Sequence, residues 1–546
     1  MALSSRLPRV IGQPIWLWAV GLAALGIGLK LVLLAMGGFP FHADEAVVGL
    51  MARHIVQGRW PAFFYGQAYM GSLDASLVGL AFTLIGESVG AIRAVQILLY
   101  GGTILTTIGL AREVSPHPAL PILAAAFMAI PPVNVTLYTT VSLGGYGEAL
   151  LIGNVLLLLA LKANREPHRS WIFAVWAALA GLGFWAFGLT LVYSLPSAIL
   201  LIRTLGRRLP GRQALGRASL MVVCGLAGAG PWIWSVGSRG ASAFVSELMG
   251  SAIVGSSPSA VLPYLGAHAL NLLLFGSTVI FGLRPPWEVR WLAWPLLPLA
   301  VLFWLAALTL AGRGLRRERP LNTARSLLVG VVALVLFGFW LTPFGADPSG
   351  RYFLPLAVPL AIIGAELVLW LAGHAAAGLA VAGLAGVLGF NLWGTVESAL
   401  RNPPGISTQF GPDTQIDAED LRALVPLLEG SNEQRGYTNY WVAYPLAFLS
   451  GERLIFVPQL PYHRDLRYTA RDDRYAPYNG MVESSERVAY ITSLQPELDR
   501  VIRGGLTENG VSWREATVGT IRVFYQLSEP ISPAELGLPP GILPPG

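Results

Sequence analysis

Long apolar runs separated by short polar connections make up most of the first 396 residues of the chain. The first run, residues 15–36, is long enough to cross a bilayer, because a membrane helix needs about 20 predominantly apolar residues. Together with later runs of the same character, it predicts about eleven membrane-spanning helices. The later runs are residues 89–111, 119–132, 147–161, 171–187, 189–202, 218–236, 291–311, 326–343, 353–371 and 377–393.

Basic residues are unevenly distributed among the connections between these runs. Cytoplasmic loops are enriched in Lys and Arg, so the cation-rich connections are predicted to lie inside. If the N-terminus is cytoplasmic, every basic cluster lies inside, whereas opposite loops such as residues 132–146 carry few cations or none. We therefore predict a multi-pass plasma-membrane protein with a cytoplasmic N-terminus and no cleavable signal peptide. The clusters are Arg112; Lys162, Arg165 and Arg169; Arg203, Arg207, Arg208, Arg212 and Arg217; and Arg313, Arg316, Arg317, Arg319 and Arg325.

This topology leaves three long segments on the outer side: residues 37–88, residues 237–290, and everything after about residue 396. Within the first segment, residues 46–58 have the amphipathic pattern of a helix that lies in the membrane interface. Residues 72–86 are predicted to be a second interfacial helix, because a span there would invert every later basic cluster. By the same reasoning, residues 261–283 lie outside or re-enter the membrane.

The chain changes character after residue 396, where charged residues become frequent and prolines punctuate the sequence. Short β-like runs and helical periodicity alternate there, which is typical of a small soluble α/β domain. We predict that residues 397–546 form this domain outside the membrane, with a disordered Pro-rich tail from residue 533 onwards. The expected strands are residues 453–457, 487–492 and 517–526, and the expected helices are residues 418–429 and 494–509.

Composition agrees with the spans and narrows the possible chemistry. The chain is 54% hydrophobic and 12% charged with a mean hydropathy of +0.57, whereas soluble domains are about one quarter charged. The net charge of +6 does not indicate a nucleic-acid partner, because the cations lie in short loops between apolar runs. The single cysteine, Cys224, excludes an intramolecular disulfide. The sequence also shows no metal-ligand spacing and no glycine-rich phosphate loop, so we expect no bound metal and no nucleotide.

The pair Asp44-Glu45, shortly after the first span, is the first candidate for catalysis. Carboxylates at a membrane surface are costly to desolvate and are often functional when they face a cavity. A carboxylate near a hydroxyl can take its proton, so Asp44 is the predicted general base. Glu45 points about 100° away on a helix and is expected to orient that helix instead. The alternative is that both acids only complement the dipole of a helix N-terminus.

Two further charged residues border predicted spans on the outer side. Glu148 follows a glycine-rich loop and opens the next predicted span, where it can serve as a helix N-terminal acid. Arg351 carries a planar guanidinium suited to a phosphate, although an arginine at a span end can also extend to lipid headgroups. Arg93 has the same two interpretations. His54, Tyr65 and Tyr69 can line a substrate pocket, but interfacial aromatic residues also act as membrane anchors.

The order of these features resembles the GT-C glycosyltransferase superfamily, and within it the protein O-mannosyltransferase and aminoarabinose-transferase branch. Three short blocks carry the resemblance, and the layout extends over most of residues 1–396. One departure is notable: relatives often carry a basic residue and a Pro pair where this chain has Gln67-Ala68. The blocks are Asp44-Glu45-Ala46 through Gly58-Arg59-Trp60, Tyr65-Gly66-Gln67-Ala68-Tyr69-Met70-Gly71, and Arg351-Tyr352-Phe353-Leu354-Pro355-Leu356.

The resemblance implies an all-α polytopic membrane domain of GT-C type over residues 1–396, followed by the soluble α/β domain. It also implies inverting transfer of a sugar from a polyprenyl-phosphate donor to an acceptor hydroxyl on the outer face. The acceptor can be a protein, a lipid or a cell-envelope glycan, and the family includes metal-dependent and metal-independent members. A transporter or flippase is the alternative, although no repeated halves are visible. The expected catalytic residues are Asp44 and Glu148, and the expected substrate-binding residues are Glu45, His54, Tyr65, Gln67, Tyr69, Arg93, Arg351 and Tyr352.

Overall fold

The computed structural model describes residues 15–240, 242, 261–318, 320–347, 349–374, 377–466, 468–493 and 495–538. Predictions about the first 14 residues, most of the segment 237–260 and the end of the Pro-rich tail therefore lie outside the described residues. The described chain divides into two compact units. The helical unit comprises residues 15–36, 93–240 and 261–400, and the mixed unit comprises residues 37–92 and 401–538.

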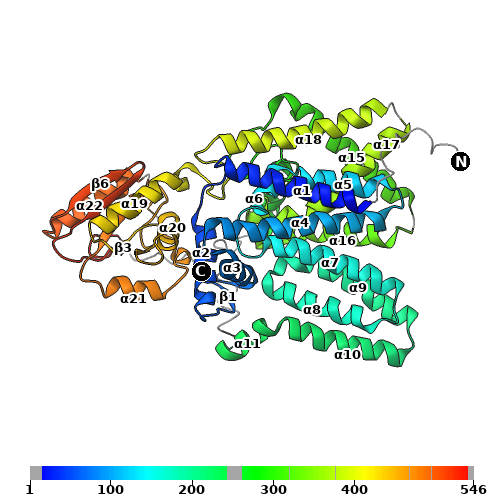
Figure 1. The fold of residues 1–546 in the computed structure, drawn as a ribbon, viewed down its shortest axis with the longest axis horizontal. Helices are drawn as coiled ribbons and strands as arrows, with labels where there is room; N and C mark the ends of the chain where they lie inside the picture. Colours follow the sequence, from blue (N-terminus) through cyan, green and yellow to red (C-terminus); the bar gives the residue numbers. More distant parts are fainter. Residues whose placement is uncertain are drawn as a thin grey trace. The chain divides into compact units, whose positions relative to one another are not determined.

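The helical unit is built almost entirely from α-helices (Figure 1). Among the described residues, nine helical stretches are long and apolar enough to cross a membrane. This finding confirms a multi-pass membrane protein. The stretches are Leu17–Ala35, Val89–Val114, Tyr146–Arg165, Gly188–Arg208, Leu262–Ile280, Trp294–Arg317, Thr323–Leu341, Arg351–His374 and Ala377–Leu400. The helices in them are α1 (Ile15–Ala35), α4 (Val89–Val114), α7 (Tyr146–Arg165), α9 (Leu191–Arg208), α13 (Val261–Leu270), α14 (Ser277–Ile280), α15 (Leu297–Arg317), α16 (Thr323–Leu341), α17 (Ala357–His374) and α18 (Ala377–Leu400).

Three of the predicted spans differ from a simple crossing helix. Helices α5 (Ala119–Ala129) and α8 (Ser170–Ala186) are shorter than the usual length, and α10 (Gly211–Gly228) meets α11 (Gly230–Arg239) at a bend of 65°. The bent pair passes the length criterion only as one broken span. The charge pattern predicted that residues 261–283 lie outside the membrane or re-enter it. The helical stretch Leu262–Ile280 is nevertheless long enough to cross a membrane, and its centre is π-helical.

Small residues allow helices of this unit to approach closely. Helices α7, α8 and α10 lie side by side in Figure 1. A methyl group at Gly181 would lie 2.1 Å from the carbonyl oxygen of Gly225, and one at Gly228 would lie 2.1 Å from that of Ala178. Side chains are therefore excluded where α8 crosses α10, as expected for membrane helices that associate by backbone proximity.

The mixed unit contains residues 37–92 together with the C-terminal domain. The segment forms α2 (Ala43–Val56), a short hairpin of β1 (Phe63–Phe64) and β2 (Gln67–Gly71), and α3 (Leu73–Ile85). At 1.5 Å per residue, the 13 residues of α3 extend over only about 20 Å, which is too short for a bilayer core of about 30 Å. Helix α2 packs on α20 (Tyr440–Leu449), and most of its residues are buried, including Arg53 and His54.

A five-stranded mixed sheet forms the core of the C-terminal part, with strand order β4-β3-β5-β7-β6. Strand β3 pairs in parallel with β4 and β5, and β7 pairs antiparallel with β5 and β6. The predicted α/β class is therefore confirmed, whereas β3, α20 and α21 were not expected. The single strand predicted over residues 517–526 is wrong, because a turn after residue 518 divides that region between β6 and β7. The elements are α19 (Ala418–Gly430), β3 (Arg435–Tyr437), β4 (Ile455–Val457), α21 (Pro477–Glu483), β5 (Ala489–Ser493), α22 (Pro496–Glu508), β6 (Arg514–Val518) and β7 (Ile521–Tyr525).

Candidate functional site

Asp44 lies in the first turn of α2 and is held by two hydroxyl groups of the C-terminal domain. The Tyr440 hydroxyl donates a hydrogen bond of 2.6 Å to Oδ1, and the Thr408 hydroxyl donates one of 3.2 Å to Oδ2. The side chain retains 30% of its accessible surface. A carboxylate that accepts two hydrogen bonds and stays partly open is oriented and still accessible to a substrate hydroxyl. Its neighbour Glu45 is fully buried.

Tyr440 is the first residue of α20, so the N-terminal cap of this helix fixes its position. The side chain of Asn439 caps this helix by accepting a hydrogen bond from the backbone N–H of Trp441 at 3.0 Å. Asparagine is one of the favoured residues at this position. Burial and the adjacent charge of Asp44 raise the pKa of Tyr440 well above its usual value. The hydroxyl therefore stays protonated and remains a donor to the Asp44 carboxylate.

Arg474 connects the hairpin of β1 and β2 to the region around Asp44. Its guanidinium lies 5.5 Å from the ring centroid of Tyr440. With the Gln67 amide oxygen turned toward it, Nη1 and Nη2 of Arg474 donate hydrogen bonds of 2.6 Å and 2.9 Å to that oxygen. Arg474 also interacts electrostatically with Tyr69 and Asp472. Gln67 and Tyr69, both predicted from the sequence as substrate-binding residues, are therefore close to one buried cation.

Asp472 is a buried carboxylate in the same region. Burial raises its pKa to about 6, against the opposing effects of Arg474 and Arg471 and a hydrogen bond from Tyr462, while the charge of Asp44 adds to the increase. We expect protonation of Asp472 to stabilise the fold on the order of 3 kcal/mol as the pH falls from above 6 to below 4. The sign follows because the folded protein binds this proton more tightly than the unfolded chain does.

The measurement is thermal unfolding of the wild-type protein and of Asp472→Asn between pH 4 and pH 7.5. The difference between the two transition temperatures should favour the variant at neutral pH and shrink toward pH 4. A difference that does not depend on pH would contradict a raised pKa at this carboxylate.

Glu452 is the centre of a second polar cluster, in which α2 meets the C-terminal domain. Its carboxylate accepts hydrogen bonds from His54 Nε2 at 2.9 Å, Tyr478 at 2.7 Å and Arg53 Nη1 at 3.3 Å. Burial alone would raise the pKa of Glu452, but the hydrogen bonds from His54 and Tyr478 and the charges of His54 and Arg53 lower it to about 2. The other ring nitrogen of His54 is 2.7 Å from the hydroxyl of Tyr65. His54 and Tyr65 thus belong to a cluster that joins α2 to the C-terminal domain.

The remaining predicted site residues belong to the helical unit. Glu148 is buried in the first turn of α7, 3.5 Å from the amide nitrogen of Gln96. Arg351 forms an ion pair with Asp347, and its guanidinium lies 5.1 Å from the ring centroid of Tyr352. Its i, i+4 partner Asp347 was not expected from the sequence. Arg93 and Tyr352 are buried, Arg93 in α4 and Tyr352 in the 3-10 turn Arg351–Leu356.

Lys30 is a charged residue of the helical unit that the sequence analysis missed. It lies inside α1, and its ammonium group donates hydrogen bonds to Thr139 and Thr140 at 2.7 Å and 2.8 Å and to the carbonyl oxygen of Thr136 at 3.2 Å. It is also 4.4 Å from the ring centroid of Tyr100. A lysine inside an apolar run is itself a signal, because intramembrane charges are rare and costly. Here the hydrogen bonds connect α1 to the loop that leads toward Glu148.

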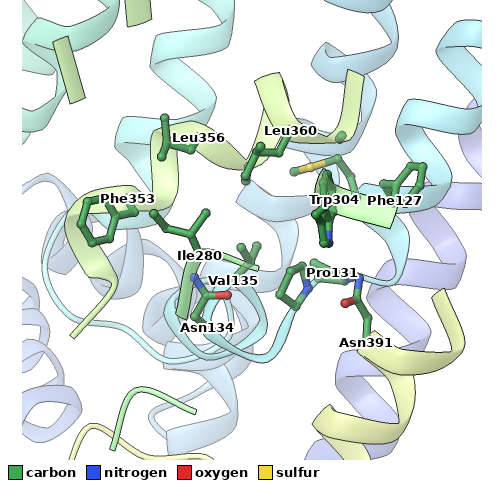
Figure 2. A pocket seen from close by; sticks show the side chains of 14 residues that line it. Phe127, Pro131, Asn134, Val135, Ile280, Trp304, Phe353, Leu356, Leu360 and Asn391 are labelled. Atoms are coloured by element: carbon green, nitrogen blue, oxygen red, sulfur yellow. The ribbon is translucent and has the colours of Figure 1, made fainter. Parts of the chain in front are cut away.

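A small cavity of about 30 Å³ lies within the helical unit (Figure 2). Its lining is mostly apolar, including Phe127, Trp304 and Phe353, with Asn134 and Asn391 as polar groups. In the part of the chain that the structure describes, no three His, Cys, Asp or Glu side chains gather closely enough to hold a metal ion.

Comparison with known proteins gives a result only at the level of structure. No protein-family model matches the sequence, and no curated protein matches it either. The structure of ArnT from Cupriavidus metallidurans bound to undecaprenyl phosphate is similar, with a TM-score of 0.59, 14% identity, and coverage of 93% of this chain and 97% of that chain. The apo oligosaccharyltransferase from Archaeoglobus fulgidus has a TM-score of 0.50 and 12% identity, covering 90% of this chain and 71% of that one. The protein has the GT-C fold.

The GT-C fold confirms the structural part of the family resemblance. Both similar structures are glycosyltransferases, and the similarity to ArnT extends over nearly the whole of both chains. The fold class of a helical membrane domain with a small C-terminal α/β domain is likewise confirmed. At these identities the comparison carries no residue roles, so the roles of Asp44, Glu148 and Arg351 depend on local geometry and chemistry.

Proposed function

We propose that the protein is a membrane glycosyltransferase that moves a sugar from a polyprenyl-phosphate donor to an acceptor hydroxyl on the outer membrane face, with inversion at the anomeric carbon. The observation that carries the proposal is Asp44: a partly open carboxylate, oriented by Tyr440 and Thr408, in a chain with the GT-C fold. The undecaprenyl phosphate bound to ArnT supports a lipid-linked donor. The proposal places the N-terminus in the cytoplasm and the C-terminal domain outside.

In the proposed reaction, Asp44 takes the proton of the acceptor hydroxyl. The acceptor oxygen attacks the anomeric carbon, and the bond from that carbon to the phosphate oxygen breaks. The lipid phosphate leaves with the bonding electrons, so the configuration is inverted. A positioned base typically contributes about 10²–10⁴-fold to such a step. We propose that Oδ2 takes the proton. Its hydrogen bond from Thr408, at 3.2 Å, is longer and therefore weaker than the bond of 2.6 Å from Tyr440 to Oδ1.

Arg351 and Arg93 are proposed to bind the donor phosphate from the helical unit. A guanidinium can donate two parallel hydrogen bonds to phosphate oxygens and stabilise the charge that develops on the leaving group. The ion pair with Asp347 and the contact with Tyr352 hold the Arg351 side chain in place. Glu148, in the first turn of α7, is proposed to accept a hydrogen bond from a sugar hydroxyl.

The test is turnover of radiolabelled polyprenyl-phosphate sugars by the purified full-length protein in lipid nanodiscs. A panel that differs only in the sugar should contain one donor from which labelled sugar is transferred or slowly released. Loss of turnover on addition of unlabelled polyprenyl phosphate would show that the lipid phosphate is recognised. If no donor of the panel binds or reacts, the protein is not a transferase of this class, and transport of lipid-linked sugars becomes the function to measure.

Tyr440→Phe should lower the turnover number by about tenfold to a hundredfold with little change in KM for the donor. The reason is that a hydrogen bond to a charged group is worth about 1.5–3 kcal/mol, and its loss frees the Asp44 carboxylate to rotate. Steady-state kinetics at saturating donor would measure the effect. Tyr437→Phe, which removes the hydroxyl of another buried tyrosine in the same domain, is the matched control. Equal turnover in Tyr440→Phe and the wild-type protein would show that this contact does not position the base.

A further inference from the structure

The region around Asp44 contains an excess of buried hydrogen-bond donors. Gln409 Nε2, Trp441 Nε1, Arg471 Nε and Arg474 Nε are buried nitrogen atoms without a hydrogen-bond partner among the described residues. Buried polar groups in folded proteins are nearly always paired, because an unpaired donor costs about 1–3 kcal/mol. Several unpaired donors in one region therefore indicate a binding site whose ligand supplies the acceptor oxygens.

Three of these donors belong to residues that neighbour the partners of Asp44. Gln409 follows Thr408, and Trp441 follows Tyr440, the two residues whose hydroxyls bind Asp44. The Arg474 guanidinium lies 5.5 Å from the ring centroid of Tyr440. Arg474 also interacts electrostatically with Asp44 itself.

Arg471 reaches the same region through two other residues. It interacts electrostatically with Asp472, and Asp472 accepts a hydrogen bond from Tyr462. The ring of Tyr462 lies 6.2 Å from that of Trp441. The fourth donor is therefore connected to the other three through the same polar cluster.

The connection between β4 and α21 supplies the arginines of this region. It extends over residues 458–476, of which the structure describes all but residue 467, and contains only the one-turn 3-10 helix Ala470–Asp472. Loops of this length without secondary structure are uncommon in compact domains and are usually functional.

The balance of charge indicates the chemical class of the ligand. Arg471 and Arg474 are offset by the two carboxylates Asp44 and Asp472, so the cluster has no large excess of positive charge that would favour an anion. A sugar ring has hydroxyl groups that accept hydrogen bonds from N–H groups and donate them to carboxylates. A neutral sugar can therefore accept hydrogen bonds from the buried N–H groups and donate them to the carboxylates without adding charge.

We infer that the C-terminal domain forms a binding subsite for a neutral sugar of the acceptor, next to Asp44. The inference rests on the proposed function and narrows the acceptor to a carbohydrate. The hydroxyl oxygen atoms of the sugar accept hydrogen bonds from Gln409, Trp441, Arg471 and Arg474. One sugar hydroxyl donates to Asp472. An acceptor hydroxyl bound in this way lies within reach of the base.

The test uses saturation-transfer NMR with the full-length protein in nanodiscs and methyl α-mannoside and methyl β-glucoside as probes. Glucose 6-phosphate serves as the anionic probe. We expect saturation transfer to at least one neutral glycoside, reduced threefold or more in Trp441→Phe and in Gln409→Leu. Trp441→Phe keeps an aromatic ring but removes the indole N–H. The matched control is Trp513→Phe, because the Trp513 N–H donates to Glu515 in the same domain, outside this cluster.

Binding of a neutral glycoside that is equal in the wild-type protein, Trp441→Phe and Gln409→Leu would overturn the inference, as would binding of glucose 6-phosphate alone. The same glycosides added to the donor-turnover assay separate the two proposals. If binding depends on Trp441 but no donor is turned over, the transferase proposal fails and the sugar subsite stands. If donor is turned over but glycoside binding is unchanged in Trp441→Phe, the proposed sugar subsite is wrong and the transferase proposal is retained.

Discussion

Asp44→Asn is expected to lower sugar transfer by about 10²–10⁴-fold while the protein still folds and binds its donor. The amide keeps the size of the side chain. Its oxygen can accept from the Tyr440 hydroxyl and its NH2 group can donate to the Thr408 hydroxyl oxygen, but it cannot take a proton from the acceptor. The measurement is transfer of labelled sugar from the donor identified in the panel, at saturating donor, together with donor binding. The turnover number should fall, and the donor dissociation constant should change little.

Two control variants sharpen this experiment. Asp413→Asn changes a carboxylate of the same unit that forms an ion pair with the exposed Arg464, so it should retain turnover. Glu45→Gln tests the neighbouring acid, which is fully buried and is expected to act on helix orientation. If Asp44→Asn retained most of the turnover, the base would have to be another residue, and Glu148 would be the next to substitute.

Glu452→Leu is expected to destabilise the mixed unit by about 1–3 kcal/mol, because the buried Arg53 and His54 side chains lose the carboxylate to which both donate. Arg53, His54 and Tyr478 all donate to this carboxylate, and Arg53 also forms an ion pair with Glu87. The measurement is the unfolding free energy of the purified protein at neutral pH, together with limited proteolysis of the segment that contains α2.

Exposed and buried pairs can be compared within one domain. Glu429→Leu removes the partner of Arg453 in an exposed ion pair, and its cost should stay below about 1 kcal/mol. The effect of Glu452→Leu should also depend on pH. Because the pKa of Glu452 is lowered to about 2, its stabilising effect is complete above about pH 4.5 and is lost as the pH falls toward 2. Similar costs for the two substitutions would show that Glu452 does not hold α2 to the C-terminal domain.

The hydrophobic pattern alone predicted the membrane domain well, because a bilayer imposes one requirement on every span. Runs of about 20 apolar residues must satisfy their backbone hydrogen bonds internally, so they become helices. Helices α1, α4 and α7 to α9 accordingly follow the predicted runs. The short helix α5, the bend between α10 and α11 and the length of Leu262–Ile280 depend on local packing, and the apolar pattern did not distinguish them.

The candidate site also contains one residue that the sequence identified and partners that only the structure revealed. Asp44 stands out in sequence as an acid just after a span, and its chemistry is independent of the fold. Its partners Tyr440 and Thr408 are about 400 residues and 360 residues away along the chain, and only the tertiary structure brings them together. In sequence Tyr440 appears to be one of several core aromatic residues.

Gln67 and His54 were identified from the sequence, but their contacts were not. The sequence identified both as substrate-binding candidates, but their partners are Arg474 and Glu452 in the distant C-terminal domain. The sequence by itself indicated a multi-pass membrane protein and the position of most of its helices, and it made Asp44 a candidate, since these inferences follow from local composition and periodicity. Which buried donors and carboxylates meet was decided by the tertiary structure, because such contacts join residues with no local relation along the chain.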